Sequence, residues 1–281
     1  MTEGFLPDEI AAHYAMGIEE PRLQRSQGKL ELVRTQKIIR QRIPAPPAVI
    51  WDIGGGPGIY SCWLAQLGYE VHLLDAMSLH VEQAMAASAS QPNHPIASIQ
   101  VGDARRLPAA DRSADVVLLL GPLYHLIDRS ERLAALIEAR RILKPGGTVF
   151  GAAVSRFASA FDGLRHDFLA DPAFVEIVKR DLATGQHRNP TNHPWYFTTA
   201  FFHHPDELAA EMRESGLEVE GVLGVEGPGW LQKDFETDWE NPERRERMLW
   251  LAHTLESEPS LLGMSAHLIG IGRLPSSQLP G

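Results

Sequence analysis

The residues best suited to chemistry are an acidic residue and three glycines that follow an apolar run. Asp52 lies near the end of the run 49–53, and Gly54, Gly56 and Gly58 come directly after it. Because glycine has no Cβ, a turn of this composition lets backbone N–H groups approach a ligand closely. The sequence therefore predicts a ligand-binding turn between a buried strand and a helix.

Two further carboxylates, Asp75 and Asp103, end the next predicted strands. Asp75 is placed to accept hydrogen bonds from the two hydroxyls of a ribose, as acidic residues do in nucleotide-binding α/β folds. Asp103, between Gly102 and Ala104, is placed to accept from an adenine amino group, while the next backbone N–H serves a ring nitrogen. Taken singly, each has a plainer interpretation, a strand-end carboxylate or a Gly-Asp turn. Their succession favours a nucleotide-like ligand.

The glycine spacing does not match the dinucleotide-binding fingerprint. The dinucleotide fingerprint G-x-G-x-x-G, started at Gly54, requires glycine at position 59, where this chain has Ile59. The observed pattern is D-x-G-x-G-x-G, from Asp52 to Gly58. A nicotinamide-dependent oxidoreductase is therefore disfavoured.

These residues need elements that bring several strand ends to one edge. Apolar runs over 49–53, 69–75, 96–101, 114–120 and 148–154 predict strands, with helical patterns between them. This alternation predicts an α/β fold, a parallel sheet covered by helices on both faces. Ligands bind such sheets at the carboxyl ends of the strands, so the turn and the carboxylates should share one site.

Tyr124 and His125 follow the predicted strand over 114–120, a continuous apolar run, at the same predicted edge. His125 is the first candidate for a general base, which is needed only if the reacting group must lose a proton. Tyr124 is a candidate for orienting that group, and packing is the alternative for both residues. Asp128 and Glu131 have capping-box spacing and predict the start of a helix.

The block Arg141 to Gly147 links this helix to the strand over 148–154 and ends in Lys-Pro-Gly-Gly. Together with the turn 52–58, Asp75 and Gly102-Asp103-Ala104, it resembles the motifs of class I S-adenosylmethionine (SAM)-dependent methyltransferases, in family order and at family distances. Within that family the block is similar to the "type 11" small-molecule group, which includes ubiquinone and menaquinone methylases. The resemblance covers about residues 48–154.

The resemblance implies a Rossmann-like, mostly parallel sheet of seven strands with helices on both faces and an antiparallel last strand. It implies SAM as cofactor and S-adenosylhomocysteine as product. The residues that we expect to contact the cofactor are Tyr14, Asp52, Gly54, Gly55, Gly56, Gly58, Asp75, Ala76, Asp103, Ala104 and Gly121.

We expect segments outside the core to form a cap and a lid over the site. The predicted domains are an N-terminal helical cap (1–45), a SAM-binding core (46–154 and 201–274), a helical substrate lid inserted at 155–200 and a flexible tail (275–281). Insertions at strand ends commonly carry recognition residues. His187 and Tyr196 in the lid, and Trp230 in a Gly-Pro-Gly-Trp turn, are therefore candidates for substrate binding, with packing as the alternative.

Composition narrows the classes of partner. The net charge of −10, from 36 acidic and 26 basic residues, disfavours nucleic acid. One cysteine, Cys62, leaves no disulfide or cysteine-based zinc site within the chain. No H-x-x-x-H pair occurs, so no metal is expected. Without a signal-peptide pattern in residues 1–10, or an apolar run of roughly 18 residues, we expect a cytoplasmic protein without membrane association, as a monomer or homodimer.

We therefore expect transfer of a methyl group from SAM to an O, N or C nucleophile of a small molecule by in-line displacement. The sulfonium carries its own leaving group, so positioning and water exclusion can supply much of the catalysis. The alternative is a regulatory protein that binds SAM or a nucleotide without turnover.

Overall fold

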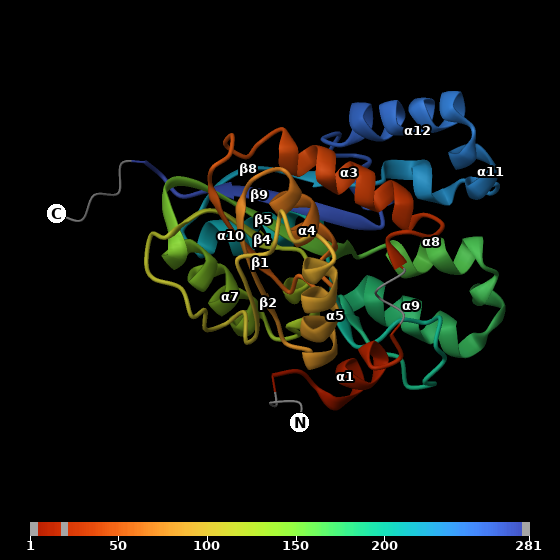
Figure 1. Ribbon diagram of the computed structural model, residues 1–281. Helices are drawn as coiled ribbons and strands as arrows, with labels where there is room; N and C mark the ends of the chain where they lie inside the picture. The colour runs from red at the N-terminus through yellow and green to blue at the C-terminus, as the bar shows by residue number, and fades with distance from the viewer. Residues whose placement is uncertain (1–4, 18–21, 277–281) are drawn as a thin grey trace.

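Nine strands form one mixed sheet in the computed structural model, which describes residues 5–17 and 22–276 (Figure 1). Along the main path of the sheet the strands are β3 (Ser98–Val101), β2 (Glu70–Asp75), β1 (Val49–Ile53), β4 (Ala114–Leu119), β5 (Leu143–Ser155), β7 (Ala200–His203) and β6 (Gln186–His187). Beside β5 lie β9 (His267–Arg273) and, beyond it, β8 (Glu218–Gly224).

The pairing confirms the predicted Rossmann-like topology. Strands β3, β2, β1, β4 and β5 are mutually parallel, and Ile53 pairs with both Leu74 and Leu119. Strand β9 runs antiparallel to β5 and β8, as the family resemblance implied. The short strands β6 and β7, which the sequence analysis did not predict, extend the sheet at the carboxyl end of β5.

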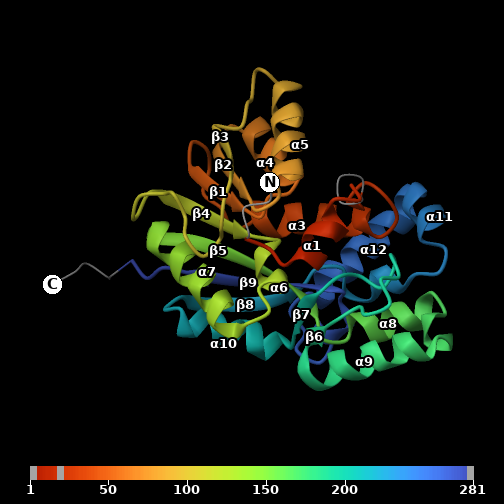
Figure 2. The same ribbon diagram turned by 90° about the horizontal axis from the view of Figure 1, so that it is seen from below.

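Helices cover both faces because the central strands are apolar on both sides. On one face lie α3 (Gly28–Arg40), α4 (Ile59–Gln66) and α5 (Ser78–Ala89), and on the other α7 (Arg129–Ile142) and α10 (Pro205–Glu214) (Figure 2). Ile39 and Leu64 belong to the apolar cluster on the first of these faces. Leu136 and Met212 belong to the apolar cluster on the other face.

The predicted start of α7 is confirmed, but two local details around this helix are wrong. Asp128 is the N-cap residue, yet its side chain caps no backbone N–H, and Glu131 forms an ion pair with Arg105 rather than closing a capping box. The Lys-Pro-Gly-Gly segment is not a loop between helix and strand. Strand β5 starts at Leu143, and this segment forms an irregularity between the pairings of Ala114 and Val116.

Three groups of elements lie outside this sheet-and-helix frame. The N-terminal region contains α1 (Asp8–Tyr14) and α3. The insertion after β5 contains α8 (Ala158–Arg165), η1 (Phe168–Ala170) and α9 (Pro172–Thr184), which lead into β6 and β7. Between β8 and β9 lie η2 (Gly227–Leu231), α11 (Phe235–Glu240), α12 (Pro242–Leu255) and η3 (Leu262–Met264).

The helices between β8 and β9 pack on the N-terminal region. Leu30 of α3 belongs to a small apolar cluster with Phe235 and Trp239 of α11, which places α3 beneath α11 and α12 (Figure 1). Short α6 (Pro122–His125) follows β4 at the edge of the sheet. Within the described residues no helix is both long and apolar enough to cross a membrane. The predicted flexible tail lies, from residue 277 on, outside the described residues.

Candidate active site

A pocket opens at the carboxyl edge of β1, β2 and β4. The glycine turn 54–57, the segments 75–77, 102–104 and 120–122, and residues 124–126 line it. Tyr14 of α1 and residues of α3 close its other side. The three strand ends singled out in the sequence therefore meet in one cavity, as parallel pairing requires.

The floor of this pocket is a contact between two turns that only glycine permits. Gly54 has φ +70°, and a Cβ there would lie 2.6 Å from Pro122. A Cβ on Gly121 would lie 2.9 Å from the carbonyl oxygen of Gly54. Because the turns after β1 and β4 touch backbone to backbone, they leave room above them for a ligand.

Asp75 joins the glycine turn to the end of β2. Its Oδ2 accepts from the Gly56 N–H at 2.8 Å, and its Oδ1 accepts from the Met77 N–H at 2.9 Å. His80 Nδ1 lies 3.1 Å from the same Oδ1. The carboxylate is therefore held in one orientation at the pocket wall, and it retains lone-pair capacity for a ligand hydroxyl.

Asp52 is fully buried beneath the turn. Its Oδ2 accepts from the Ser61 hydroxyl at 2.7 Å, whereas its Oδ1 has no hydrogen-bond partner among the described residues. Burial raises the pKa of Asp52 to about 6, the Ser61 hydrogen bond opposes this, and the charge of Asp75 adds to it. An unsatisfied, desolvated carboxylate oxygen at a pocket wall suits a cationic group such as an ammonium.

Asp103 is engaged within the chain. Its carboxylate accepts from the Arg105 backbone N–H at 2.8 Å and from Arg105 Nε at 2.9 Å. Arg105 also forms an ion pair with Glu131 of α7. The side chain lines the pocket at the end of β3, where the sequence predicted an adenine contact.

Tyr14 and His125 meet although they lie far apart in the chain. The Tyr14 hydroxyl is 2.5 Å from His125 Nε2, and His125 Nδ1 lies 3.4 Å from the carbonyl oxygen of Thr199. Because a carbonyl only accepts, the ring proton belongs on Nδ1, and Nε2 accepts from the Tyr14 hydroxyl. This arrangement joins α1, α6 and the loop before β7 at the pocket wall.

A buried arginine holds the loop that carries His125. Arg132 Nη1 donates to the carbonyls of Leu126 and Ile127 at 2.9 and 2.7 Å. Its Nε and Nη2 donate to Glu211 of α10. Burial raises the pKa of Glu211, but His203 and Arg132 outweigh it and lower the value to about 2. The pair thus stays ionised and fixes the loop after β4.

Most of the predicted site residues line this pocket, and some do not. Those that line it are Tyr14, Asp52, Gly54, Gly55, Gly56, Asp75, Ala76, Asp103, Ala104, Gly121, Tyr124 and His125. The structure places Gly58 behind the turn, where a Cβ would lie 3.2 Å from Ala84 of α5. Its positive φ of +86° begins α4, so its visible role is in the backbone.

The three predicted substrate residues lie outside the pocket lining. His187 Nδ1 is 2.8 Å from Asp181, and its Nε2 is 2.7 Å from the Tyr196 carbonyl. The Tyr196 hydroxyl donates to Asp171, and its ring packs on Phe174. Trp230 Nε1 donates to the Met264 carbonyl. The bonds of His187 and Tyr196 lie within the 155–203 segment, and the bond of Trp230 joins η2 to η3. In the structure all three side chains therefore contribute to packing.

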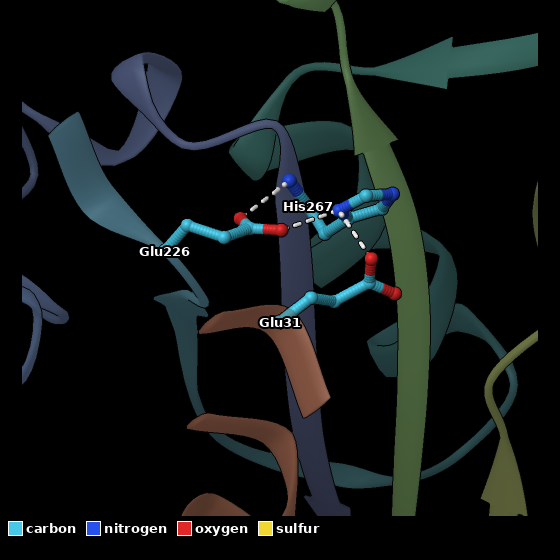
Figure 3. A group of neighbouring side chains, drawn as sticks. All are labelled: Glu31, Glu226 and His267. Atoms are coloured by element: carbon cyan, nitrogen blue, oxygen red, sulfur yellow. Dashed lines mark hydrogen bonds and ion pairs between the residues drawn. The ribbon is translucent and has the colours of Figure 1, made fainter. Parts of the chain in front are cut away.

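Sequence reasoning missed His80 and a group on the opposite wall. His80 lies in the first turn of α5, shortly after Asp75 in the chain, and its buried Nε2 has no partner among the described residues. The other group is Glu31, Glu226 and His267, whose ligand atoms lie within 4.8 Å of one another (Figure 3). The short distance along the chain from Asp75 could have indicated His80, but the residues of the other group come from three distant segments and leave no local signal.

Comparisons with known proteins agree with this geometry. A family model described as a methyltransferase domain matches residues 51–151. The chain is 30% identical over 199 residues to a ubiquinone/menaquinone biosynthesis C-methyltransferase of Acidiphilium cryptum, covering 66% of this chain and 75% of that protein. The chain belongs to the class I SAM-dependent methyltransferases. Its cofactor is therefore SAM, and it is an enzyme of methyl transfer.

Two further similarities place this methyltransferase within the family. It is 28% identical over 204 residues to a ubiquinone biosynthesis O-methyltransferase of Xylella fastidiosa, covering 71% of this chain and 73% of that one. Its fold matches a SAM-dependent methyltransferase structure from Mesorhizobium loti with a TM-score of 0.59 and 17% identity, over 87% of this chain and 99% of the other. The sequence-based family assignment is confirmed.

The pocket residues fit the cofactor on grounds visible in the structure. Asp52 Oδ1 lacks a partner among the described residues where an ammonium would satisfy it, and Gly54 and Gly121 let the turns after β1 and β4 pack together as the floor of the pocket. Asp75 retains acceptor capacity for ribose hydroxyls. We therefore expect the turn after β1, the end of β2 and the end of β3 to hold the adenosyl and amino-acid parts.

Proposed function

We propose that this pocket methylates a nucleophilic O, N or C atom of a small molecule, with Tyr14 and His125 handling the proton of the acceptor. The observation that carries this proposal is the 2.5 Å contact between the Tyr14 hydroxyl and His125 Nε2. Both residues line the same pocket as the glycine turn and Asp75. A hydroxyl–imidazole pair at the wall of a ligand pocket is suited to moving a proton.

The chain's own groups account for the proton. When bound, SAM supplies an electrophilic methyl group on a sulfonium. An acceptor hydroxyl beside Tyr14 gives its proton to the Tyr14 oxygen, while the Tyr14 proton moves to His125 Nε2. His125 then carries a proton on each nitrogen, with Nδ1 facing the Thr199 carbonyl. Once its proton is removed, the acceptor oxygen would be ready to take the methyl group that bound SAM would supply, with the sulfide of S-adenosylhomocysteine as the leaving group.

A small acceptor is supported by the surroundings of this pair. α1 lies over the pocket and is tied to the segment before β7, because the Thr199 hydroxyl donates to Glu9 and the Thr198 hydroxyl donates to the Glu9 carbonyl. Apolar residues Leu126, Ala152 and Ile269 line the interior. The two named relatives act in ubiquinone biosynthesis by their names, which favours a small organic acceptor over a polymer.

The domain roles and the location remain part of this proposal. We propose that residues 1–45 and 155–200 act as cap and lid over the core, since Tyr14, Arg22 and Glu31 line the pocket and the Thr199 carbonyl lies beside His125. We also propose a cytoplasmic enzyme, in keeping with a single cysteine that is free in the structure.

The test is incubation with SAM that carries an isotope-labelled methyl group and a pool of small metabolites, followed by mass spectrometry. The expected result is a labelled small molecule together with S-adenosylhomocysteine. Tyr14→Phe should slow turnover by roughly 10²-fold for a hydroxyl acceptor. Tyr69→Phe is the matched control, because its hydroxyl donates to the Pro44 carbonyl away from the pocket. Label found only on protein or nucleic acid, or equal rates for both variants, would contradict the proposal.

A further inference from the structure

An ionic cluster forms part of the wall of this pocket. Arg22, Glu31 of α3 and His267 of β9 line the pocket, and Glu226 lies behind His267. Arg22 forms a paired interaction with Glu31, with nitrogen–oxygen distances of 2.5 and 3.0 Å. His267 Nδ1 lies 2.5 Å from Glu226 and 3.7 Å from Glu31 (Figure 3).

Glu226 is fixed more firmly than an ordinary surface carboxylate. It is buried, and it accepts from the Ser265 hydroxyl at 2.7 Å and from the His267 backbone N–H at 3.1 Å. Its second oxygen therefore has one fixed position, beside His267 Nδ1. Because a carboxylate only accepts, Nδ1 must donate to it. Nε2 is therefore the ring nitrogen that remains available to a ligand.

The charge balance of the cluster decides the state of His267. Two carboxylates, Glu31 and Glu226, face one guanidinium, Arg22, so a neutral imidazole would leave an unmatched negative charge in a largely buried group. A charged imidazolium closes the balance. In agreement, burial lowers the pKa of His267, but Glu31 and Glu226 outweigh it and raise the value to about 9.

The second ring nitrogen is the part of the cluster that a ligand can reach. Figure 3 shows Nε2 on the far side of the ring from Glu226, with the Glu31 carboxylate below the ring. The His267 side chain is 27% exposed and lines the pocket, and Nε2 makes no hydrogen bond to any residue in ranges 5–17 and 22–276. A positively charged N–H donor on a residue that lines a cavity matches an anionic oxygen.

We propose that His267, held by Glu226 and Glu31, donates its Nε2–H to a carboxylate of a ligand in this pocket. This inference rests on the proposed function, since it concerns the same cavity. Either of two ligands can present this carboxylate: the cofactor, through its amino-acid part, or an acidic acceptor. Both share the chemistry of a carboxylate oxygen accepting from an imidazolium.

Two variants of His267 test the contribution of Nε2 separately from that of Nδ1. In His267→Asn the amide nitrogen can take the place of Nδ1 and keep the bond to Glu226, but nothing replaces Nε2. In His267→Gln the amide nitrogen can reach the place of Nε2 and keep a neutral donor there. If His267 served folding alone, the two variants would bind the ligand with similar affinity. If Nε2 binds the ligand, affinity should be highest in wild type, lower in His267→Gln and lowest in His267→Asn.

Calorimetric titration distinguishes the sources. S-adenosylhomocysteine carries the carboxylate, and 5′-methylthioadenosine lacks the amino-acid part. If the cofactor is the source, His267→Asn weakens S-adenosylhomocysteine binding by roughly 10-fold or more and leaves 5′-methylthioadenosine unchanged. If the acceptor is the source, both ligands bind as in wild type. Binding of benzoate to the S-adenosylhomocysteine complex is then lost in the Asn variant and partly retained in the Gln variant.

The pH dependence gives an independent check. The wild-type advantage over the Asn variant should be present at pH 7 and fall as pH rises through about 9, where His267 loses its charge. Equal affinities of wild type and His267→Asn for all three ligands would overturn the inference. Wild-type protein that binds no S-adenosylhomocysteine would be a different failure, because it would remove the proposed function itself.

Discussion

Replacing Asp75 by Asn tests the organisation of the site most sharply. The carboxylate accepts from Gly56 N–H on one oxygen and from Met77 N–H and His80 on the other. An amide keeps the shape but turns one acceptor into a donor that must face another donor. The free energy of unfolding without ligand should therefore fall by about 1–3 kcal/mol.

The effect on ligand binding should be larger, because a ribose hydroxyl also loses its charged acceptor. A loss of about 2.7 kcal/mol corresponds to roughly 100-fold weaker binding. At a ligand concentration 100 times the wild-type Kd, binding adds about 2.7 kcal/mol to the free energy of unfolding of wild type and about 0.4 kcal/mol to that of the variant. For a chain of this size the shift in Tm should fall from about 5 °C to about 1 °C.

The assay is thermal unfolding with and without S-adenosylhomocysteine, and Asp115→Asn is the control. Asp115 also accepts a backbone N–H, from Val49 at 2.8 Å, but at the opposite edge of the sheet. This control should keep the full ligand-induced shift. A wild-type shift in Asp75→Asn would refute the assignment of Asp75 to the ribose.

Two further changes have defined outcomes. The folded-state pKa of Asp52 is raised to about 6, so ionisation costs stability as pH rises above its unfolded value. Asp52→Asn should therefore be more stable than wild type at pH 7.5 and equal to it near pH 4, and urea titrations at the two pH values that show no such difference would contradict this. Gly121→Ala should lower both Tm and S-adenosylhomocysteine affinity, because its Cβ would lie 2.9 Å from the Gly54 carbonyl oxygen. Gly221→Ala, with nothing within 4 Å, should change neither, and similar losses in both variants would point to a general effect of alanine.

The sequence was sufficient for the parts of the fold whose signals are local. The strand that ends at Asp75 and the helix between it and the next strand lie where the apolar patterns placed them. Because parallel strands place their carboxyl ends at one edge, Asp75 and Asp103 could be assigned to a common site before any coordinates. The antiparallel last strand came from the family resemblance, since no local pattern gives strand direction.

Interactions between distant segments were beyond such patterns. Glu131 has the spacing of a capping residue but pairs with Arg105, so a tertiary ion pair displaced a local motif. Arg132 lies among other charged residues of α7, and no local pattern distinguishes it, yet it is buried against Glu211 and holds the loop after His125. His267 and Glu226 become partners only when β9 pairs with β8.

A crystal structure of the complex with S-adenosylhomocysteine tests the central claim most directly. We predict the ribose hydroxyls on Asp75, the amino group near Asp52 Oδ1, and the sulfur facing the space beside Tyr14 and His125. A ligand bound elsewhere, or one whose sulfur faces away from that space, would contradict it.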